Sequence, residues 1–320
     1  VGAGEAVRIF TGAPVPEGAD AVVMQELCEH AGEGVVQVNH VPRNGENIRR
    51  AGEDIRSGAE ILASGARLTP QDIGLAASVG LATLPVFRRL RVAVFFTGDE
   101  LSMPGEALKP GGIYNSNRYT LRGLLGALGC EVRDLGIVRD TLEATRAALR
   151  EAAAKSDVII TSGGVSVGEE DHLRPAVQAE GRVDYWQMAI KPGKPLAFGE
   201  VRRADGSHAW FMGLPGNPVS SFITFLLVVR PALMALQGAP AGAPRALKLR
   251  ADFDWPRPDK RREFLRVRRN EAGGLDLFPN QSSGVLTSAV WGDGVVDNPS
   301  GQAIAKGDLV DFLSFAELLA

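Results

Sequence analysis

The stretch of sequence that decides the fold is DVIITSGGVSVGEED, residues 157–171. Its apolar run at 158–160 lies between an aspartate and a glycine-rich turn, which predicts a buried parallel strand. The loop that follows, residues 161–168, has small side chains and many free backbone N–H groups, and such a loop at the carboxyl end of a strand can hold an anion. Three carboxylates, Glu169, Glu170 and Asp171, come directly after it. Together these features indicate a phosphate-bearing ligand with a divalent metal.

A plainer interpretation of the same stretch stays open. A glycine turn often precedes a helix, and acidic residues suit the first turn of a helix because they oppose its dipole. The loop has neither the Walker A spacing nor that of a dinucleotide-binding GxGxxG motif. The stretch alone therefore does not decide between an anion site and a helix start.

Strand and helix patterns alternate on both sides of this stretch, between residues 80 and 237, and predict a parallel α/β sheet. Apolar runs at 91–96 and 130–138 are further strands of that sheet. Because the carboxyl ends of parallel strands meet at one edge, the loops at 97–100, 162–168 and 213–217 are expected to converge on one crevice. The acids expected on that edge are Asp99, Glu100, Asp140 and Asp171. For Asp140, a capping pair with Glu143 at the next helix is the competing interpretation.

The basic loop IKPGKP, residues 190–195, places Lys191 and Lys194 on either side of a glycine. Prolines beside both lysines stiffen the chain, which favours an anion site over a solvated turn. Further on, Asn217 and Pro218 have the residue types of an N-cap and a first helical turn. They open the most apolar helix, at 222–236, whose N-terminus is either an anion site or a simply capped end.

The outer parts of the chain are β-rich. Residues 1–56 have strand patterns at 21–24 and 35–38, and residues 57–79 contain a helix that Thr69 caps. Residues 238–320 have short strand patterns at 247–250, 264–267, 275–278, 303–305 and 309–313. They predict a small β-barrel, with a sandwich as the alternative. A group of arginines in this part is either an anion patch or a solvated strand edge: Arg261, Arg262, Arg266, Arg268 and Arg269.

The composition excludes several classes of function. The 320 residues carry a net charge of −3 and are 45% hydrophobic, which fits an ordinary globular chain and gives no support to nucleic-acid binding. Cys28, Cys130 and the four histidines show no metal-ligand spacing, and so few cysteines favour a reducing, cytoplasmic compartment. The apolar run at 222–229 is too short to cross a membrane, so no membrane contact is expected. The chain starts at Val1 in what reads as mid-domain sequence, so we expect that an N-terminal segment is missing.

A series of motifs resembles those of the molybdopterin molybdenumtransferases, the MoeA proteins that are also similar to the E domain of gephyrin. They are GEAVRI at 4–9, TGAPVP at 11–16, GEDI at 52–55, TGDEL at 97–101, SGGVS at 162–166, KPGKP at 191–195 and LPGNP at 214–218. Since they occur in order over nearly the whole chain, the combination is specific. The wider pterin-binding α/β domains share only the loop at 162–166.

The resemblance implies an α/β-plus-β multidomain fold and an elongated homodimer. Residues 1–56 would form a β-rich domain that is incomplete at its N-terminus, 57–79 part of a split connector domain, 80–237 an α/β molybdopterin-binding domain of the MoaB and Mog kind, and 238–320 a C-terminal β-barrel domain. It also implies a reaction in which molybdate is inserted into adenylylated molybdopterin, with Mg²⁺ as cofactor and release of AMP. The implied partners are a second subunit, the molybdopterin adenylyltransferase that supplies the substrate, and proteins that handle the finished cofactor.

The resemblance also implies site residues. Glu100, Asp140 and Asp171 match catalytic acids of the family, as Mg²⁺ ligands or as groups that face the phosphate. Thr11 would be a further catalytic residue that reaches the pocket across the dimer. The positions that match the pterin and molybdate pocket are Ser162, Gly163, Gly164, Ser166, Lys191, Lys194, Pro215, Pro218, either Arg262 or Arg266, and Ser283. Fixed N–H groups and cations of this kind hold a dianionic oxyanion well.

The chain departs from the family pattern at two points, and two other functions stay open. Gln187 stands where some relatives carry lysine, and one acid that the family's active site uses lies N-terminal to Val1. The first alternative is a pterin-binding or scaffold module without catalysis, as in gephyrin-like E domains. The second is a paralogue for tungstate, an oxyanion of nearly the same size and charge as molybdate.

Overall fold

The structure, a computed structural model, describes residues 1–164, 172–240 and 242–319. Within these, the chain forms two compact units. The first consists of residues 1–63 and 68–82, and the second of residues 64–67 and 83–320. Each unit thus combines two of the four expected domains, and the finer division at 1–56, 57–79, 80–237 and 238–320 stays a prediction.

The first unit has little regular structure. It contains the 3-10 turn η1 (Gln25–Leu27), the antiparallel pair β1 (Cys28–Gly32) and β2 (Val35–Val38), and helix α1 (Pro70–Ser78). The expected strand at 35–38 and the expected N-cap Thr69 are confirmed, and Thr69 forms a full capping box with Asp72. The strand expected at 21–24 is wrong, because that segment pairs with no strand in the described chain and leads directly into η1.

The second unit contains a six-stranded sheet in the order β6–β3–β7–β11–β10–β8. Its strands are β3 (Arg91–Thr97), β6 (Glu131–Val138), β7 (Val158–Ser162), β8 (Gly181–Gln187), β10 (Pro195–Arg202) and β11 (His208–Leu214). The first four strands in the sheet order are parallel, as expected, but β10 runs antiparallel to both its neighbours, so the sheet is mixed. The reason is the short turn at 203–207 between β10 and β11, which allows a hairpin but is too short for a parallel crossover.

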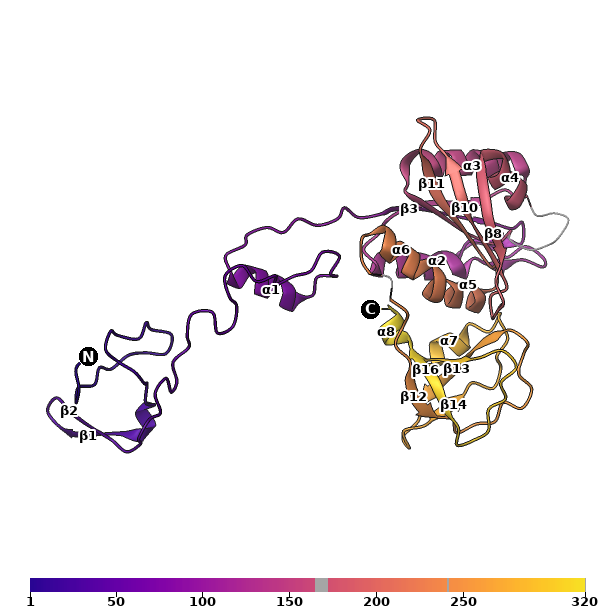
Figure 1. The fold of residues 1–320 in the computed structure, drawn as a ribbon. Helices are drawn as coiled ribbons and strands as arrows, with labels where there is room; N and C mark the ends of the chain where they lie inside the picture. Colours follow the sequence, from indigo (N-terminus) through magenta and orange to yellow (C-terminus); the bar gives the residue numbers. More distant parts are fainter. Residues whose placement is uncertain (165–171, 241, 320) are drawn as a thin grey trace. The chain divides into compact units, whose positions relative to one another are not determined.

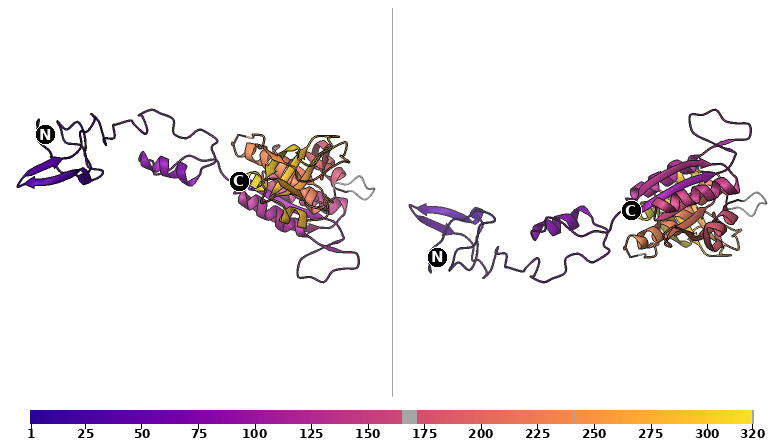
Figure 2. Two further views of the ribbon diagram at one scale, coloured as in Figure 1. Left: turned by 90° about the horizontal axis from the view of Figure 1, so that it is seen from below. Right: turned by 90° about the horizontal axis from the view of Figure 1, so that it is seen from above.

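Helices cover both faces of this sheet (Figure 1). One face packs against α2 (Ser116–Ala127) and the apolar helix at 218–236, and the other against α3 (Leu142–Lys155) and α4 (Leu173–Glu180). The loop between β3 and α2, which carries the short strands β4 (Leu101–Ser102) and β5 (Ile113–Tyr114), projects from the body of the unit (Figure 2). The buried β3 and β7, apolar along nearly their whole length, are what a doubly covered parallel sheet requires.

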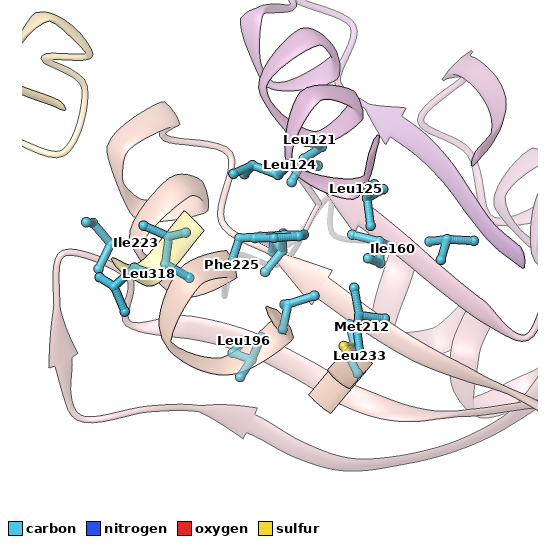
Figure 3. Close-up of a cluster of buried hydrophobic side chains, with 14 of the residues drawn as sticks. Leu121, Leu124, Leu125, Ile160, Leu196, Met212, Ile223, Phe225, Leu233 and Leu318 are labelled. Carbon is cyan, nitrogen blue, oxygen red and sulfur yellow. The ribbon is translucent and has the colours of Figure 1, made fainter. Parts of the chain in front are cut away.

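The apolar helix is longer than the sequence suggested. It joins α5 (Pro218–Thr224), the π-helical η2 (Phe225–Val229) and α6 (Arg230–Leu236). With 19 residues and a mean hydropathy of 1.9 it is long enough to cross a membrane, so the expectation of a run that is too short was wrong. Length and composition are weak evidence, however, because half of this helix is buried in the unit, as in a core helix. Figure 3 shows Ile223, Phe225 and Leu233 in one cluster with Leu121 and Ile160.

A second sheet makes up most of the C-terminal part, in the order β12–β16–β15–β13–β14. Its strands are β12 (Leu247–Arg250), β13 (Arg262–Arg269), β14 (Leu275–Leu277), β15 (Gly294–Asn298) and β16 (Leu309–Ser314), with the short helices α7 (Thr287–Trp291) and α8 (Phe315–Leu319). The strand expected at 303–305 is only a bridge between Ile304 and Trp255, and β15 was not expected. A bridge between Ala251 and Leu275 links the two ends of the sheet, but closure into a barrel stays a prediction.

The two sheets of this unit share a core. β9 (Ile190–Lys191), which follows β8, pairs in parallel with β13. Along β13 the side chains alternate: Phe264 packs in the cluster that contains the α/β helices, whereas Leu265 and Val267 pack in the cluster of the C-terminal sheet. Leu318 of α8 also belongs to the first cluster (Figure 3). The C-terminal sheet is therefore packed directly against the α/β part.

Candidate functional site

The topology brings the expected loops to one edge of the α/β sheet. In register, Phe96 of β3 lies opposite Ser162 of β7, which lies opposite Leu214 of β11, and Thr97 lies opposite Val138 of β6. The loops after these four parallel strands therefore start at nearly the same level. β8 runs parallel to β11, because two antiparallel steps separate them, so the lysine loop after β8 lies at this edge as well.

The glycine loop is packed tightly over the end of β3. Gly163 and Gly164 have φ values of +99° and +63°. A Cβ at Gly163 would lie 2.4 Å from the Thr97 carbonyl oxygen, and one at Gly164 would lie 2.7 Å from Thr97 Oγ1. Both positions thus need glycine, for backbone conformation and for space. Ser166 and Asp171 lie outside the described residues, so their expected roles stay predictions.

Asn117, in the first turn of α2, ties two of these loops together. Its side chain is 8% exposed, and Nδ2 donates to Ser162 Oγ at 2.8 Å and to the Gly216 carbonyl at 2.7 Å. Ser162 Oγ in turn donates to the Pro215 carbonyl at 2.9 Å. Asn117 belongs to none of the sequence motifs named above. An asparagine in the first turn of a helix is a weak signal, because this residue type more often serves as the N-cap.

The acids at this edge come from neighbouring strands. Glu100 is exposed, and its carboxylate folds back over Gly98, where a Cβ would lie 2.6 Å from Oε2. Asp140 is half-buried directly after β6. The interpretation of Asp140 as a cap is wrong, because Thr141 is the N-cap of α3 and its Oγ1 accepts from the Ala144 N–H. Among the described residues no three metal-ligating side chains form a group.

The lysine loop is anchored to the C-terminal sheet. Lys191 Nζ lies 3.1 Å from Glu263 Oε1 and 3.3 Å from Asp259 Oδ2, so its charge is already paired. Lys194 is exposed and lies in an open hollow of about 660 Å³. Described residues that line this hollow are Gln187, Met188, Ala189, Lys194, Asp259, Lys260 and Arg261. Gln187, the departure noted in the sequence, thus lies beside Lys194.

The N-terminus of α5 meets the C-terminal sheet. Pro215 is buried and Pro218 half-buried, and Asn217 occupies the N-cap position without a side-chain capping bond. The Val219 N–H, one of the free donors of the first turn, donates to the Ser283 carbonyl at 3.0 Å. The structure therefore brings Ser283 to the same edge as Pro215 and Pro218.

The two candidate arginines differ sharply. Arg262 is exposed and forms a bidentate pair with Asp297, through Nε at 2.5 Å and a terminal nitrogen at 2.6 Å. Arg266 is 1% exposed, and no carboxylate of the described chain pairs with it. Its guanidinium donates to Ser288 Oγ, to the Phe264 carbonyl and to the Ser282 carbonyl, and burial lowers its pKa to about 10.

Arg262 and Arg266 each lie two residues from Phe264 on β13, so all three share the face that packs against the α/β helices. The groups to which Arg266 donates all belong to the C-terminal part. Thr11 is exposed in the first unit, and its expected contact with the site stays a prediction.

Comparisons with known proteins cover the chain almost from end to end. Residues 1–80 match the MoeA N-terminal region (domain I and II), residues 93–235 a probable molybdopterin binding domain, and residues 248–315 the MoeA C-terminal region (domain IV). Molybdopterin molybdenumtransferase 2 of Mycobacterium tuberculosis is 36% identical over 301 residues, which is 91% of this chain and 72% of that protein. The chain belongs to the molybdopterin molybdenumtransferase family.

Other members of the family are similar in sequence and in structure. The molybdopterin molybdenumtransferase of Haemophilus influenzae is 47% identical over 233 residues, which is 73% of this chain. A crystal structure of a molybdopterin biosynthesis MoeA protein from Pyrococcus horikoshii has a TM-score of 0.81 at 27% identity and covers 98% of this chain and 76% of that one. The chain spans 56% of the Haemophilus relative and 60% of a relative from Nostoc.

Proposed function

We propose that this chain, as part of its whole protein, inserts molybdate into adenylylated molybdopterin and releases AMP. The observation that carries the proposal is the distribution of charge along one sheet edge. Acids follow β6 and β3, the glycine loop follows β7 in the middle, and the lysine loop follows β8 at the far end. A ligand with phosphates at one end and an oxyanion acceptor at the other matches this order.

The length of the edge supports an extended ligand. Six strands have five intervals between them, and at about 4.8 Å each these span about 24 Å. An adenylylated pterin is long enough to lie across several of these strands. The glycine loop follows β7, the neighbour of β3, and would pass beneath the phosphates, whose oxygens backbone N–H groups hold without adding side-chain bulk.

Magnesium fits the acidic end by the chemistry of its donors. Glu100 and Asp140 supply carboxylate oxygens, the donors that Mg²⁺ prefers, and Asp171 would be the third acid. When bound there, Mg²⁺ would neutralise phosphate charge and polarise the bond to the leaving AMP. The chain's own residues would orient the ligand: Asn117 holds the loops that follow β7 and β11 in one arrangement.

For the molybdate end, the structure favours Arg266 over Arg262. The Arg262 guanidinium is already neutralised by Asp297, whereas Arg266 is buried without a carboxylate partner in the described chain and donates to the residue before Ser283. A buried unpaired cation is costly, and a dianion beside it would repay that cost. Lys194, Arg266 and Ser283 are therefore the proposed molybdate contacts, with Pro215 and Pro218 shaping the pocket.

The wider expectations are part of the same proposal. The protein would act as a cytoplasmic homodimer, with Thr11 reaching the site of the other subunit, and would receive its substrate from a molybdopterin adenylyltransferase. Family membership supports this assignment, since the relatives named above are molybdopterin molybdenumtransferases.

The test is molybdate-dependent release of AMP from adenylylated molybdopterin by the full-length protein with Mg²⁺. Asp171→Ala and Lys194→Ala are expected to abolish release, whereas Lys248→Ala, an exposed lysine paired with Asp311, should leave it unchanged. Tungstate replaces molybdate in a parallel reaction, and turnover with tungstate alone would identify a tungstate enzyme. Tight pterin binding without AMP release under any condition would refute the transferase and leave a binding module.

A further inference from the structure

The segment that carries Ser283 links the C-terminal sheet to the α/β part without being a strand itself. β14 ends at Leu277, and residues 278–286 form no helix or strand. The carbonyl of Ser283 accepts from the Val219 N–H of α5 at 3.0 Å. Because this segment has no ladder of backbone hydrogen bonds, other contacts must hold Ser283 in place.

The side chain of Gln281 replaces the missing strand beside Arg266. Its Oε1 accepts from the Arg266 N–H at 2.9 Å, and its Nε2 donates to the Arg266 carbonyl at 3.0 Å and to the Phe278 carbonyl at 2.8 Å. The amide thus uses both its N–H donors and its acceptor, so its orientation has no equivalent alternative. Gln281 therefore fixes the segment to the main chain of β13 just beyond the last residue that pairs with β14.

The buried side chain of Arg266 holds the next residue of the segment. Its guanidinium donates to the Ser282 carbonyl at 3.3 Å, and the Ser282 N–H donates to Asn280 Oδ1 at 3.0 Å. Gln281 and Ser282 are therefore bound to the main chain and the side chain of one residue of β13. Ser283 follows them directly in the sequence, so its position depends on these bonds.

The backbone of Ser283 is held from both sides, while its hydroxyl is free to bind a ligand. Gln281 and Ser282 fix the chain before it to β13, and the Val219 N–H binds its own carbonyl. Within the described residues the hydroxyl of Ser283 forms no hydrogen bond. A hydroxyl on a backbone that is already ordered can donate to an anion without the entropy loss of ordering a loop.

We propose that Gln281 is a positioning residue of the oxyanion site, which holds Ser283 where its hydroxyl binds molybdate. This inference rests on the proposed function and deepens its molybdate site. It assigns a role in substrate binding to a side chain whose three hydrogen bonds all join main-chain groups of the protein.

The test is Gln281→Met, because methionine is unbranched, has nearly the length of glutamine and forms none of the three hydrogen bonds. Titration calorimetry on the full chain should give a molybdate dissociation constant about tenfold higher, the effect of about one hydrogen bond to an anion. In the AMP-release assay the KM for molybdate should rise by the same factor, whereas the KM for adenylylated molybdopterin should stay unchanged. A general loss of stability would not separate the two substrates in this way.

Two further measurements show whether Gln281 acts through Ser283. Ser283→Ala should raise the molybdate dissociation constant by a similar factor, and adding Gln281→Met to it should raise the constant no further. Hydrogen exchange, followed by mass spectrometry on peptides that contain Val219, needs no ligand. Because the Val219 N–H is bound to the Ser283 carbonyl, its exchange should become faster in Gln281→Met.

Asn270→Leu is the matched control. Asn270 directly follows β13 and is half-buried, as Gln281 is. Its side-chain amide also forms three hydrogen bonds, with Asp252, Asp276 and the Gly274 N–H. The control thus removes the same number of bonds from the same sheet, and it should leave the molybdate dissociation constant and the exchange of the peptides described above unchanged.

The outcomes separate this inference from the proposed function. An unchanged affinity for molybdate in Gln281→Met, or an equal loss in Asn270→Leu, would overturn the positioning role and leave Gln281 as a structural residue. If Gln281→Met does not fold, Gln281→Asn decides, because its amide is on a shorter side chain that cannot reach all three partners. A wild type that neither binds molybdate nor releases AMP would overturn the proposed function itself, and the role of Gln281 in the molybdate site with it.

Discussion

Replacing Asn117 by alanine should weaken the site more than it weakens the fold. The variant loses the hydrogen bonds to Ser162 Oγ and to the Gly216 carbonyl, at 2.8 and 2.7 Å. Each such bond contributes about 0.5–1.5 kcal/mol net, so the expected loss in the free energy of unfolding is about 2 kcal/mol. With a slope of about 3 kcal/mol/M, the urea midpoint falls by about 0.7 M.

The effect on turnover should be larger. Without Asn117, the loops after β7 and β11 are no longer tied to each other, and small displacements of groups that orient a ligand cost about 10- to 100-fold in rate. The rate of AMP release at saturating molybdate should fall by that factor. It is measured without urea, at a temperature at which the variant is fully folded.

Thr120→Ala is the control for both measurements. Thr120 lies on the same helix, and its hydroxyl bonds only weakly to the Ser116 carbonyl within the helix, at 3.4 Å. Its substitution should change stability by less than about 0.5 kcal/mol. The reasoning is refuted if the Asn117→Ala midpoint equals that of the wild type, or if both variants lose activity equally.

Three further predictions concern other parts of the second unit. Gly193→Ala should weaken molybdate binding, because φ of Gly193 is +114° and the added Cβ would lie 2.5 Å from the buried Thr224 Oγ1. Calorimetry should show that the double variant with Thr224→Ala regains part of the affinity for molybdate, and a single variant that binds molybdate as the wild type does would contradict the packing argument. Asp157→Asn should reduce the fall of the urea midpoint as the pH is lowered. Burial raises the pKa of Asp157, but the bonds from Arg88 and Arg91 outweigh burial and hold this pKa below the unfolded value near 3.9, so the stability that the carboxylate adds is present above about pH 4 and is lost as the pH falls further. Identical dependence of the urea midpoint on pH in the variant and the wild type between about pH 7 and 3 would rule this out. Chelation of Mg²⁺ should stop AMP release and its re-addition restore it; turnover that continues in excess chelator would remove magnesium from the proposal.

Local patterns in the sequence were enough to predict much of the α/β sheet. The apolar runs of β3 and β7 are nearly fully buried, as doubly covered strands must be, and Thr69 caps its helix because a cap depends only on residues one turn away. The meeting of the strand-end loops at one edge also follows from local patterns, because parallel strands with helical crossovers leave no other arrangement. The motifs at that edge were sufficient to indicate the family.

Where local patterns competed, small differences in position decided the outcome. Asp140 and Thr141 are both good N-cap residues, and only the backbone shows that the helix starts after Thr141. The direction of β10 likewise depended on the short turn between β10 and β11, which makes the two strands an antiparallel hairpin and which the strand patterns alone do not reveal.

By itself, the sequence determined the residue types at the site, the strands that present them and the family to which the chain belongs. Only the tertiary structure decided which of these residues are already engaged. Asn117 meets partners 45 and 99 residues away, and Lys191 meets Glu263 across 72 residues. The choice between Arg262 and Arg266 depends on their partners in space, because Asp297 pairs with Arg262 whereas Arg266 is buried and donates to Ser288 and Ser282. The physical reason is that hydrogen bonds and ion pairs act over a few ångströms in space, and the packing of the two sheets, not distance along the chain, sets which side chains come that close.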